Sequence, residues 1–150
     1  SVARNALAFH GNIKNPNISV QEGLASDQTN NVQDSASDYA LAIENVDFDL
    51  NVLGLGPDGH VASLFPRMTD IDDQGRVIAI TDSPKPPAER ISFTMSTINS
   101  ADEVWIVAAG ESKADAVTKI IELDLSIPAS YVRGNSHTRL IVDTEAFFSE

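Results

Sequence analysis

The feature that most constrains the fold of this chain is an apolar run that passes straight into a glycine-rich turn. Residues 48–53 (FDLNVL) lead into the segment GLGPDGHVASLFP at residues 54–66. An apolar run of this length, ending in glycines, is typical of a strand buried in a parallel sheet. Parallel strands require crossover connections, which are usually helices, so the run favours an α/β fold.

Strand and helix patterns alternate along the rest of the chain. We expect strands over residues 18–21, 48–53, 76–81, 91–95 and 103–109, and helical segments over 3–10, 32–44, 97–101 and 113–122, with short elements at 130–132 and 139–142 completing the set. This order predicts a Rossmann-like layered α/β fold with a mostly parallel sheet. Ligands of such folds bind beyond the carboxyl ends of the strands, where we place the turns that start at Gly54, Gly110 and Gly134. No linker divides the chain, so we expect a single domain over residues 1–150.

The first residues already read as the end of a helix. The chain opens on Ser1 inside an apolar helical pattern, with no start methionine and no preceding strand. We therefore expect the N-terminal part of the domain to be missing, which would leave a sheet edge unpaired and this chain alone poorly active. No leader pattern is visible, and this favours a cytoplasmic protein.

Composition narrows the possible partners. Ten Lys and Arg against 22 Asp and Glu give a formal charge of −12, which disfavours nucleic acid and anionic membranes. The chain has no cysteine, which excludes disulfides and thiolate chemistry. His10, His60 and His137 are too scattered to suggest a metal site, so we expect neither a metal nor another cofactor. The sequence leaves the oligomeric state open.

Glycines at positions 54, 56 and 59 fit the pattern G-x-G-x-x-G after a strand, which is typical of dinucleotide binding. Asp82 even lies where an acidic residue would bind the ribose. Pro57 argues against this interpretation because it removes a backbone donor. Pro66 allows barely two turns of helix after Gly59, too short for the usual crossover. We therefore disfavour dinucleotide binding.

His60 is the candidate catalytic residue of this segment. We expect it in a glycine turn at the carboxyl end of a strand, opening a short helix whose backbone N–H groups attract negative charge. A histidine there can act as a general base beside a stabilised oxyanion, although a lone histidine is more often structural. Asp58 either orients the imidazole or caps the short helix.

Three blocks of residues resemble 6-phosphogluconolactonases. Residues 54–66 fit that family's signature G-x-G-x-D-G-H-x-A-S-L-F-P, residues 83–92 (SPKPPAERIS) resemble its S-P-K-P-P-x-x-R-[IV]-[ST], and residues 110–114 (GESKA) resemble its G-x-x-K-A. The resemblance spans nearly all of residues 1–143 in the same order. It implies a fold of the sugar-phosphate isomerase and deaminase type, and hydrolysis of 6-phosphogluconolactone in the pentose phosphate pathway without a cofactor.

The resemblance also implies roles for individual residues. His60 would deprotonate the attacking water with Asp58 beside it, and backbone amides around Gly56 and Gly59 would stabilise the oxyanion. The substrate phosphate would be held by cations at four positions, each of which could instead be a solvated surface charge: Lys85, Arg90, Lys113 and Arg133. Lys113 is the strongest of the four, since related sugar-phosphate enzymes use the lysine of G-x-x-K-A in this way.

Two alternatives remain at this stage. The related glucosamine-6-phosphate deaminases carry D-G-H-x-A-x-x-E-P, and Phe65 stands where they have a glutamate, which disfavours a deaminase. The family's N-terminal G-G-[ST] and D-E-R blocks are absent here, which leaves room for a sugar-phosphate-binding or regulatory module without catalysis.

Overall fold

The computed structural model describes residues 31–68 and 75–147. The chain divides into two units, residues 1–31 and 32–150, and the account below concerns the second. The segments expected at residues 3–10 and 18–21 lie outside the described residues, and the single domain stays a prediction.

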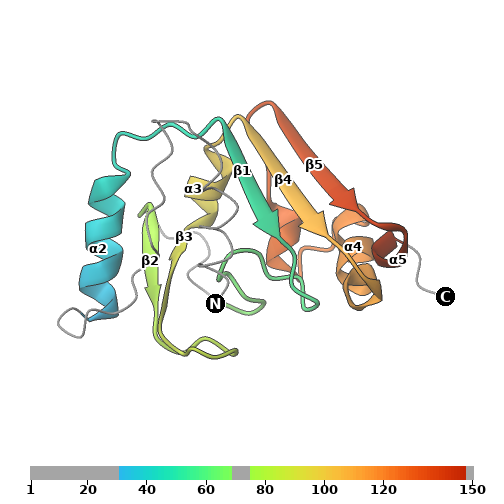
Figure 1. The fold of residues 1–150 in the computed structure, drawn as a ribbon, viewed down its shortest axis with the longest axis horizontal. Coiled ribbons are helices and arrows are strands. Elements are labelled where there is room, and N and C mark those ends of the chain that lie inside the picture. Colours follow the sequence, from blue (N-terminus) through green and yellow to red (C-terminus); the bar gives the residue numbers. More distant parts are fainter. Residues whose placement is uncertain (1–30, 69–74, 148–150) are drawn as a thin grey trace, which may run out of the picture. The chain divides into compact units, whose positions relative to one another are not determined.

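Three strands form a parallel sheet. They are β1 (Leu50–Gly54), β4 (Glu103–Ala108) and β5 (His137–Val142), in the order β1-β4-β5. Val52 pairs with Trp105, and Trp105 pairs with Arg139. Figure 1 shows the three arrows side by side and pointing the same way, so their carboxyl ends share one edge. The predicted α/β fold with a parallel sheet is confirmed.

One face of this sheet carries the main core. Leu53, Val104 and Ile106 are buried and cluster with residues of α3 (Met95–Asn99) and α4 (Ala114–Ile121). The alternate side chains along the strands are exposed: Val52, Val107 and Ile141. The expectation that residues 48–53 form a fully buried strand is therefore wrong, because β1 alternates between a buried and an open face.

The two remaining strands pair separately. β2 (Val77–Ile80) and β3 (Arg90–Phe93) form an antiparallel two-stranded sheet, covered by α2 (Val32–Ala42). The loop 81–89 joins them directly with no crossover helix, and only antiparallel strands allow such a connection. The ring of Tyr39 from α2 stacks on Phe93 with centroids 5.7 Å apart. Figure 1 shows α2 running beside β2.

The C-terminal elements complete the fold and bring two corrections. A 3-10 helix, η2 (Glu111–Lys113), leads into α4, and α5 (Thr144–Phe147) follows β5. Residues 130–132 overlap the end of a second 3-10 helix, η3 (Pro128–Tyr131), and form no strand. Gly134 does not lie at the carboxyl edge: it precedes β5, and the next amide, of Asn135, donates to Ala101 before β4 begins. Within the described ranges, no helix is long and apolar enough to cross a membrane.

Candidate active site

The segment after β1 folds into two tight turns. The Gly56 amide donates to the carbonyl of His60 at 2.8 Å, and the Gly59 amide donates to the carbonyl of Gly56 at 2.9 Å. Val61 makes isolated bridges to both Leu55 and Leu64. The short helix expected after Gly59 is wrong: Ala62 adopts a left-handed conformation with φ of 51°, which cannot continue a right-handed helix.

Two glycines make this turn possible. A Cβ on Gly56 would overlap the His60 ring and lie 2.7 Å from Asp58 Oδ1. Gly59 has φ of +81°, and a Cβ there would lie 2.5 Å from Ile127 Cβ. The N–H groups of both glycines already donate within the turn, so neither is free to bind an oxyanion. Gly56 thus lets the His60 ring lie against the backbone, and Gly59 allows the close approach of Ile127.

Asp58 and His60 form a close pair. Asp58 Oδ1 lies 2.5 Å from His60 Nδ1. Because a carboxylate only accepts, the proton belongs on Nδ1, which leaves Nε2 with a lone pair. Partial burial would raise the pKa of Asp58, but the hydrogen bond and charge of His60 and the hydrogen bond from Lys85 outweigh it and hold this pKa below its ordinary 3.8. Of the two roles expected for Asp58, the geometry supports orienting the imidazole.

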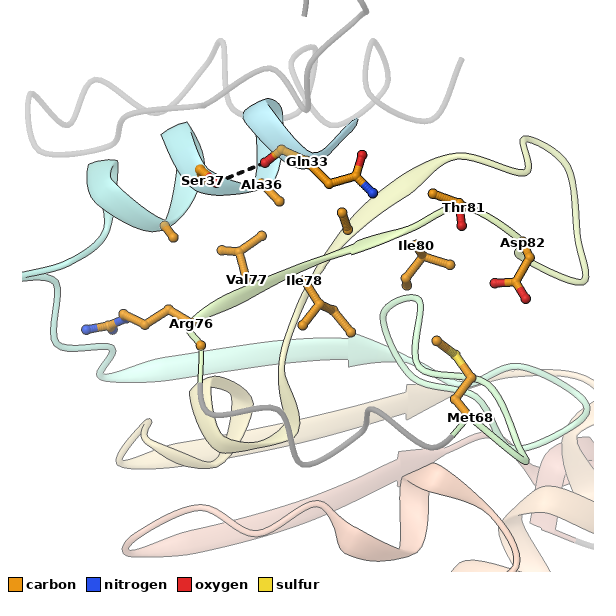
Figure 2. Close-up of a pocket in the computed structure, with 13 residues that line it drawn as sticks. Gln33, Ala36, Ser37, Met68, Arg76, Val77, Ile78, Ile80, Thr81 and Asp82 are labelled. Atoms are coloured by element: carbon orange, nitrogen blue, oxygen red, sulfur yellow. Dashed lines mark hydrogen bonds between the residues drawn. The ribbon is translucent and has the colours of Figure 1, made fainter. Parts of the chain in front are cut away.

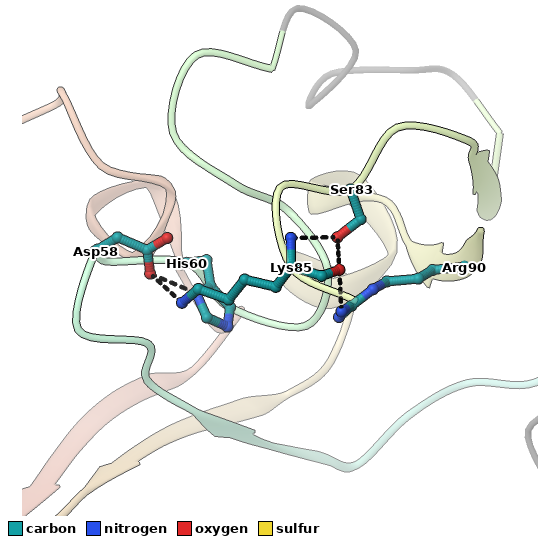
Figure 3. Close-up of polar contacts among 5 residues, drawn as sticks. All are labelled: Asp58, His60, Ser83, Lys85 and Arg90. Atoms are coloured by element: carbon teal, nitrogen blue, oxygen red, sulfur yellow. Dashed lines mark hydrogen bonds and ion pairs between the residues drawn. The ribbon is translucent and has the colours of Figure 1, made fainter. Parts of the chain in front are cut away.

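Lys85 reaches this pair from the other sheet. It lies in the loop between β2 and β3, and its Nζ is 3.3 Å from Asp58 Oδ1 and 3.5 Å from His60 Nδ1 (Figure 3). The contact with Asp58 is the meaningful one, because His60 Nδ1 already faces a carboxylate and cannot also accept a proton. One predicted cation therefore lies beside the candidate base.

Phe65 forms the apolar side of the site. The residue is 1% exposed, and the centroid of its ring lies 4.5 Å from that of the His60 ring. Arg90 Cζ and Lys85 Nζ lie 5.6 Å and 5.9 Å from the same ring centroid. The sequence predicts only that Phe65 replaces the glutamate of the deaminases, and it does not predict the contact of this ring with His60.

Arg90 is occupied by backbone carbonyls. Its Nε donates to Pro87 at 2.9 Å, and its Nη2 donates to Lys85 at 2.6 Å and to Pro86 at 2.8 Å. The Pro86–Pro87 peptide is cis. These contacts bring Arg90 to the site predicted for it, but with its Nε and Nη2 donors directed at the protein.

The other two predicted cations lie elsewhere. Lys113 ends η2 directly before α4, as expected, and within the described part of the chain its side chain has no hydrogen-bond or ion-pair partner. It follows β4, so it shares the carboxyl edge with the turn after β1. Arg133 is exposed, and its amide donates to the side-chain oxygen of Asn99. Asn99 precedes β4 and Arg133 precedes β5, so both lie toward the amino ends of these strands. The structure therefore does not bring Arg133 to His60, which follows the carboxyl end of β1.

Asp143 is a further residue of this edge that the sequence analysis missed. Both of its carboxylate oxygens accept the Gly110 amide at 3.0 Å, and Oδ1 also accepts the Ala146 amide at 2.8 Å. The carboxylate thus holds the loop that leads to Lys113. Its signal in the sequence is an acidic residue directly after an apolar strand.

Two cavities border β2 and the loop that follows it. A cavity of about 390 Å³ lies between α2 and β2, and its lining includes Gln33, Ser37 and Arg76 but none of the predicted site residues (Figure 2). A smaller one of about 290 Å³ adjoins Phe65 and Ser83. Among the residues that the structure describes, no group of three or more acidic or histidine side chains is placed to hold a metal ion.

Known proteins are similar to this chain over much of its length. A family model described as glucosamine-6-phosphate isomerases/6-phosphogluconolactonase matches residues 1–142. A 6-phosphogluconolactonase of Mycobacterium tuberculosis is 37% identical over 159 residues, covering 96% of this chain and 63% of that protein. One of Streptomyces coelicolor is 45% identical over 102 residues, covering 66% of this chain and 39% of that protein. The chain thus spans about 39% to 63% of the length of these relatives.

Solved structures show the same fold. The crystal structure of a 6-phosphogluconolactonase from Thermotoga maritima matches with a TM-score of 0.69 at 30% identity, covering 77% of this chain and 53% of that one. A monomeric glucosamine-6-phosphate deaminase matches with a TM-score of 0.64 at 22% identity, covering 78% of this chain and 54% of that one. At this identity the second likeness shows a shared fold alone.

Proposed function

Because the chain belongs to the glucosamine-6-phosphate isomerase/6-phosphogluconolactonase family, we propose that its protein hydrolyses 6-phospho-D-glucono-1,5-lactone to 6-phosphogluconate. The observation that carries the proposal is the Asp58–His60 pair, 2.5 Å apart, with Lys85 Nζ 3.3 Å from Asp58. The relatives at 37% and 45% identity are named for this reaction, which supports the same substrate class for this chain.

The reaction needs a base, a place for negative charge and a proton for the leaving oxygen. His60 Nε2 takes a proton from water as the water oxygen forms a bond to the lactone carbonyl carbon. Asp58 holds Nδ1–H and stabilises the imidazolium that results, as a carboxylate does in other base–carboxylate pairs. The ammonium of Lys85, 3.3 Å from Asp58 Oδ1, balances the charge of the oxyanion in this proposal. The imidazolium then returns its proton to the ring oxygen as the carbon–oxygen bond breaks.

The phosphate requires a separate cation. Lys113 follows the neighbouring strand at the same sheet edge, directly before the N-terminus of α4. Its ammonium and the backbone N–H groups of the helix suit an anion on a chain whose overall charge is −12. We propose Lys113 as the phosphate ligand, with the lactone ring extending from it toward His60.

Deamination is the less favoured chemistry. The position that would have to supply a carboxylate is Phe65, which is buried against the His60 ring. A phenyl ring can move no proton, so the site lacks the group that ring opening of an amino sugar requires.

A phosphorylated sugar lactone does not cross membranes freely, which supports the proposal of a cytoplasmic location.

The proposal is tested by hydrolysis of 6-phosphogluconolactone above its spontaneous rate, in the protein at its natural length. His60→Ala should lower turnover by about 10²- to 10⁴-fold, the usual contribution of a general base. The matched control is His137→Ala, which removes an exposed histidine at the start of β5 and should leave turnover unchanged. If neither the wild type nor the control hydrolyses the lactone, the proposed lactonase activity is rejected. Phosphosugar binding without catalysis would then be the function to test.

A further inference from the structure

The loop between β2 and β3 is tied down at its base, and its tip carries Lys85. The Ser83 amide donates to the carbonyl of Ala88 at 3.0 Å, which closes the loop. Ser83 Oγ donates to the Lys85 carbonyl at 2.9 Å and accepts the Lys85 amide at 3.3 Å (Figure 3). Both backbone polar groups of Lys85 are therefore held by one hydroxyl.

Arg90 adds the second anchor. As the first residue of β3 it pairs with Ile80, so its backbone is fixed by the sheet. Its guanidinium donates to three successive carbonyls, those of Lys85, Pro86 and Pro87, at 2.6 to 2.9 Å. A planar fork of donors can hold several acceptors at once, which a single ammonium cannot do.

The guanidinium of Arg90 also contacts the Phe65 ring, which packs against His60. Arg90 Cζ lies 5.6 Å from the centroid of the Phe65 ring, and the His60 ring also contacts Phe65, with centroids 4.5 Å apart. Arg90 thus contacts the loop that presents Lys85 and the ring on which His60 rests. A phosphate could recruit the Nε and Nη2 donors of Arg90 only by displacing these carbonyls.

We propose that Arg90 is a positioning residue of this site: it fixes the backbone of Lys85 so that the lysine ammonium meets Asp58 and His60, and it does not bind the phosphate. This inference rests on the proposed function and departs from the sequence-based expectation that Arg90 is a phosphate ligand. In this proposal Lys85 belongs to the reaction centre, and the position of its ammonium depends on Arg90, which lies outside that centre.

The chain offers a matched control for an arginine clamp. Arg76, at the other end of β2, donates to the carbonyls of Glu44 and Val46 at 2.9 and 2.6 Å and lies 5.8 Å from the Phe48 ring centroid. Arg76→Gln removes the same kind of contacts from the same small sheet without touching the loop of Lys85. Arg90→Gln and Arg90→Lys are compared with it, and Lys85→Met serves as the reference for loss of the ammonium.

The first readout is turnover of 6-phosphogluconolactone and of unphosphorylated gluconolactone. Arg90→Gln should lower kcat for both lactones by the same factor, roughly tenfold to a hundredfold, as expected when a reacting group is misplaced. Arg90→Lys should recover little of this loss, and Arg76→Gln should change neither rate. A loss confined to the KM of the phosphorylated lactone would overturn the inference, because it would mark Arg90 as a phosphate ligand.

The second readout, the titration of the Asp58 carboxyl group by carbon-13 NMR, does not depend on turnover. Among the described residues, the titratable side chains that contact this carboxylate are those of His60 and Lys85, so the loss of the lysine charge in Lys85→Met should raise its pKa. Arg90→Gln should raise it in the same direction, and Arg76→Gln should not.

Two results would overturn the inference: an Asp58 titration that Arg90→Gln leaves unmoved, or one that Lys85→Met leaves unmoved. Should Arg90→Gln fail to fold by circular dichroism, Arg90→Lys carries the same comparison. If the wild type hydrolyses neither lactone, the proposed function fails, whereas the titration still decides the role of Arg90.

Discussion

The loops that follow β1 and β4 leave the same edge of the sheet, yet they are built in opposite ways. In the loop after β1, His60 is paired with Asp58 at 2.5 Å and packed on Phe65. In the loop after β4, Lys113 ends a short 3-10 helix, and its side chain contacts no partner among residues 31–68 and 75–147.

This difference fits the roles that we propose for the two loops. A group that transfers a proton must be oriented before the substrate arrives, since misplacement of a reacting group is costly in rate. A cation that binds a phosphate acquires its partner from the ligand, so an internal ion pair would compete with binding. We therefore expect changes in the first loop to affect kcat and changes in the second to affect KM.

The largest effect is expected from Gly56→Ala. The new Cβ would overlap the His60 ring and press on Asp58, so the pair cannot keep its geometry. Because these obstacles are side chains that can move, stability should change little while kcat falls by about a hundredfold. Steady-state kinetics and thermal unfolding measured together check this.

The matched control for that variant is Gly54→Ala. A Cβ on Gly54 would meet no heavy atom within 4 Å, so both kcat and stability should match wild type. Equal losses of kcat in the two variants would mean that the pair does not depend on the close approach of the His60 ring to Gly56.

The second loop is tested by Lys113→Met. Loss of a charged hydrogen bond to phosphate should raise KM for the phosphorylated lactone by about 10- to 100-fold and leave kcat nearly unchanged. Lys119→Met is the control, since Lys119 lies on the same helix but is paired with Asp115 at 2.8 Å. A fall in kcat with unchanged KM would contradict the proposal that the loop after β1 acts in catalysis and the loop after β4 in phosphate binding.

A smaller effect is expected from Asp143→Ala. This carboxylate receives the amides of Gly110 and Ala146, so its loss should cost about 1 kcal/mol of stability, as for a lost helix cap. The loop of Lys113 should loosen, and KM should rise by less than in Lys113→Met. Asp143→Asn keeps an acceptor oxygen and should lie closer to wild type in urea unfolding. Equal behaviour of the two variants would show that the carboxylate does not hold the loop.

The sequence predicted the parallel sheet because strand patterns and glycine turns are local signals. β1, β4 and α4 fall close to their expected ranges. The pairing of β2 with β3 was harder to predict, because a short apolar run does not reveal whether its partner is parallel or antiparallel. Gly134 was misplaced for a related reason: glycine marks a turn but does not say at which end of a strand the turn lies.

The candidate site was predictable as a set of residues and less so as an arrangement. Asp58, His60 and Lys85 were all named, but their mutual contact depends on two loops that are 27 residues apart in the chain. The direction of the Arg90 side chain depends on three carbonyls of a folded loop, which no spacing rule describes. The loop-anchoring role that we propose for Arg90 therefore has no signal in the sequence.

The smallest effect concerns the acid stability contributed by Asp58. Its pKa lies below 3.8 in the folded protein because of His60 and Lys85, so its stabilising contribution is complete above the unfolded value and disappears as pH falls through the folded one. The side chain is 37% exposed, which limits this contribution to well under about 1 kcal/mol. Urea unfolding of wild type and Asp58→Asn in steps from pH 7 to pH 3 should show a gap in the free energy of unfolding that narrows with acid. A gap that stays constant with pH would mean that Asp58 and His60 are not paired in the free protein. The contrast between the ordered loop after β1 and the loop of Lys113 after β4 would then fail.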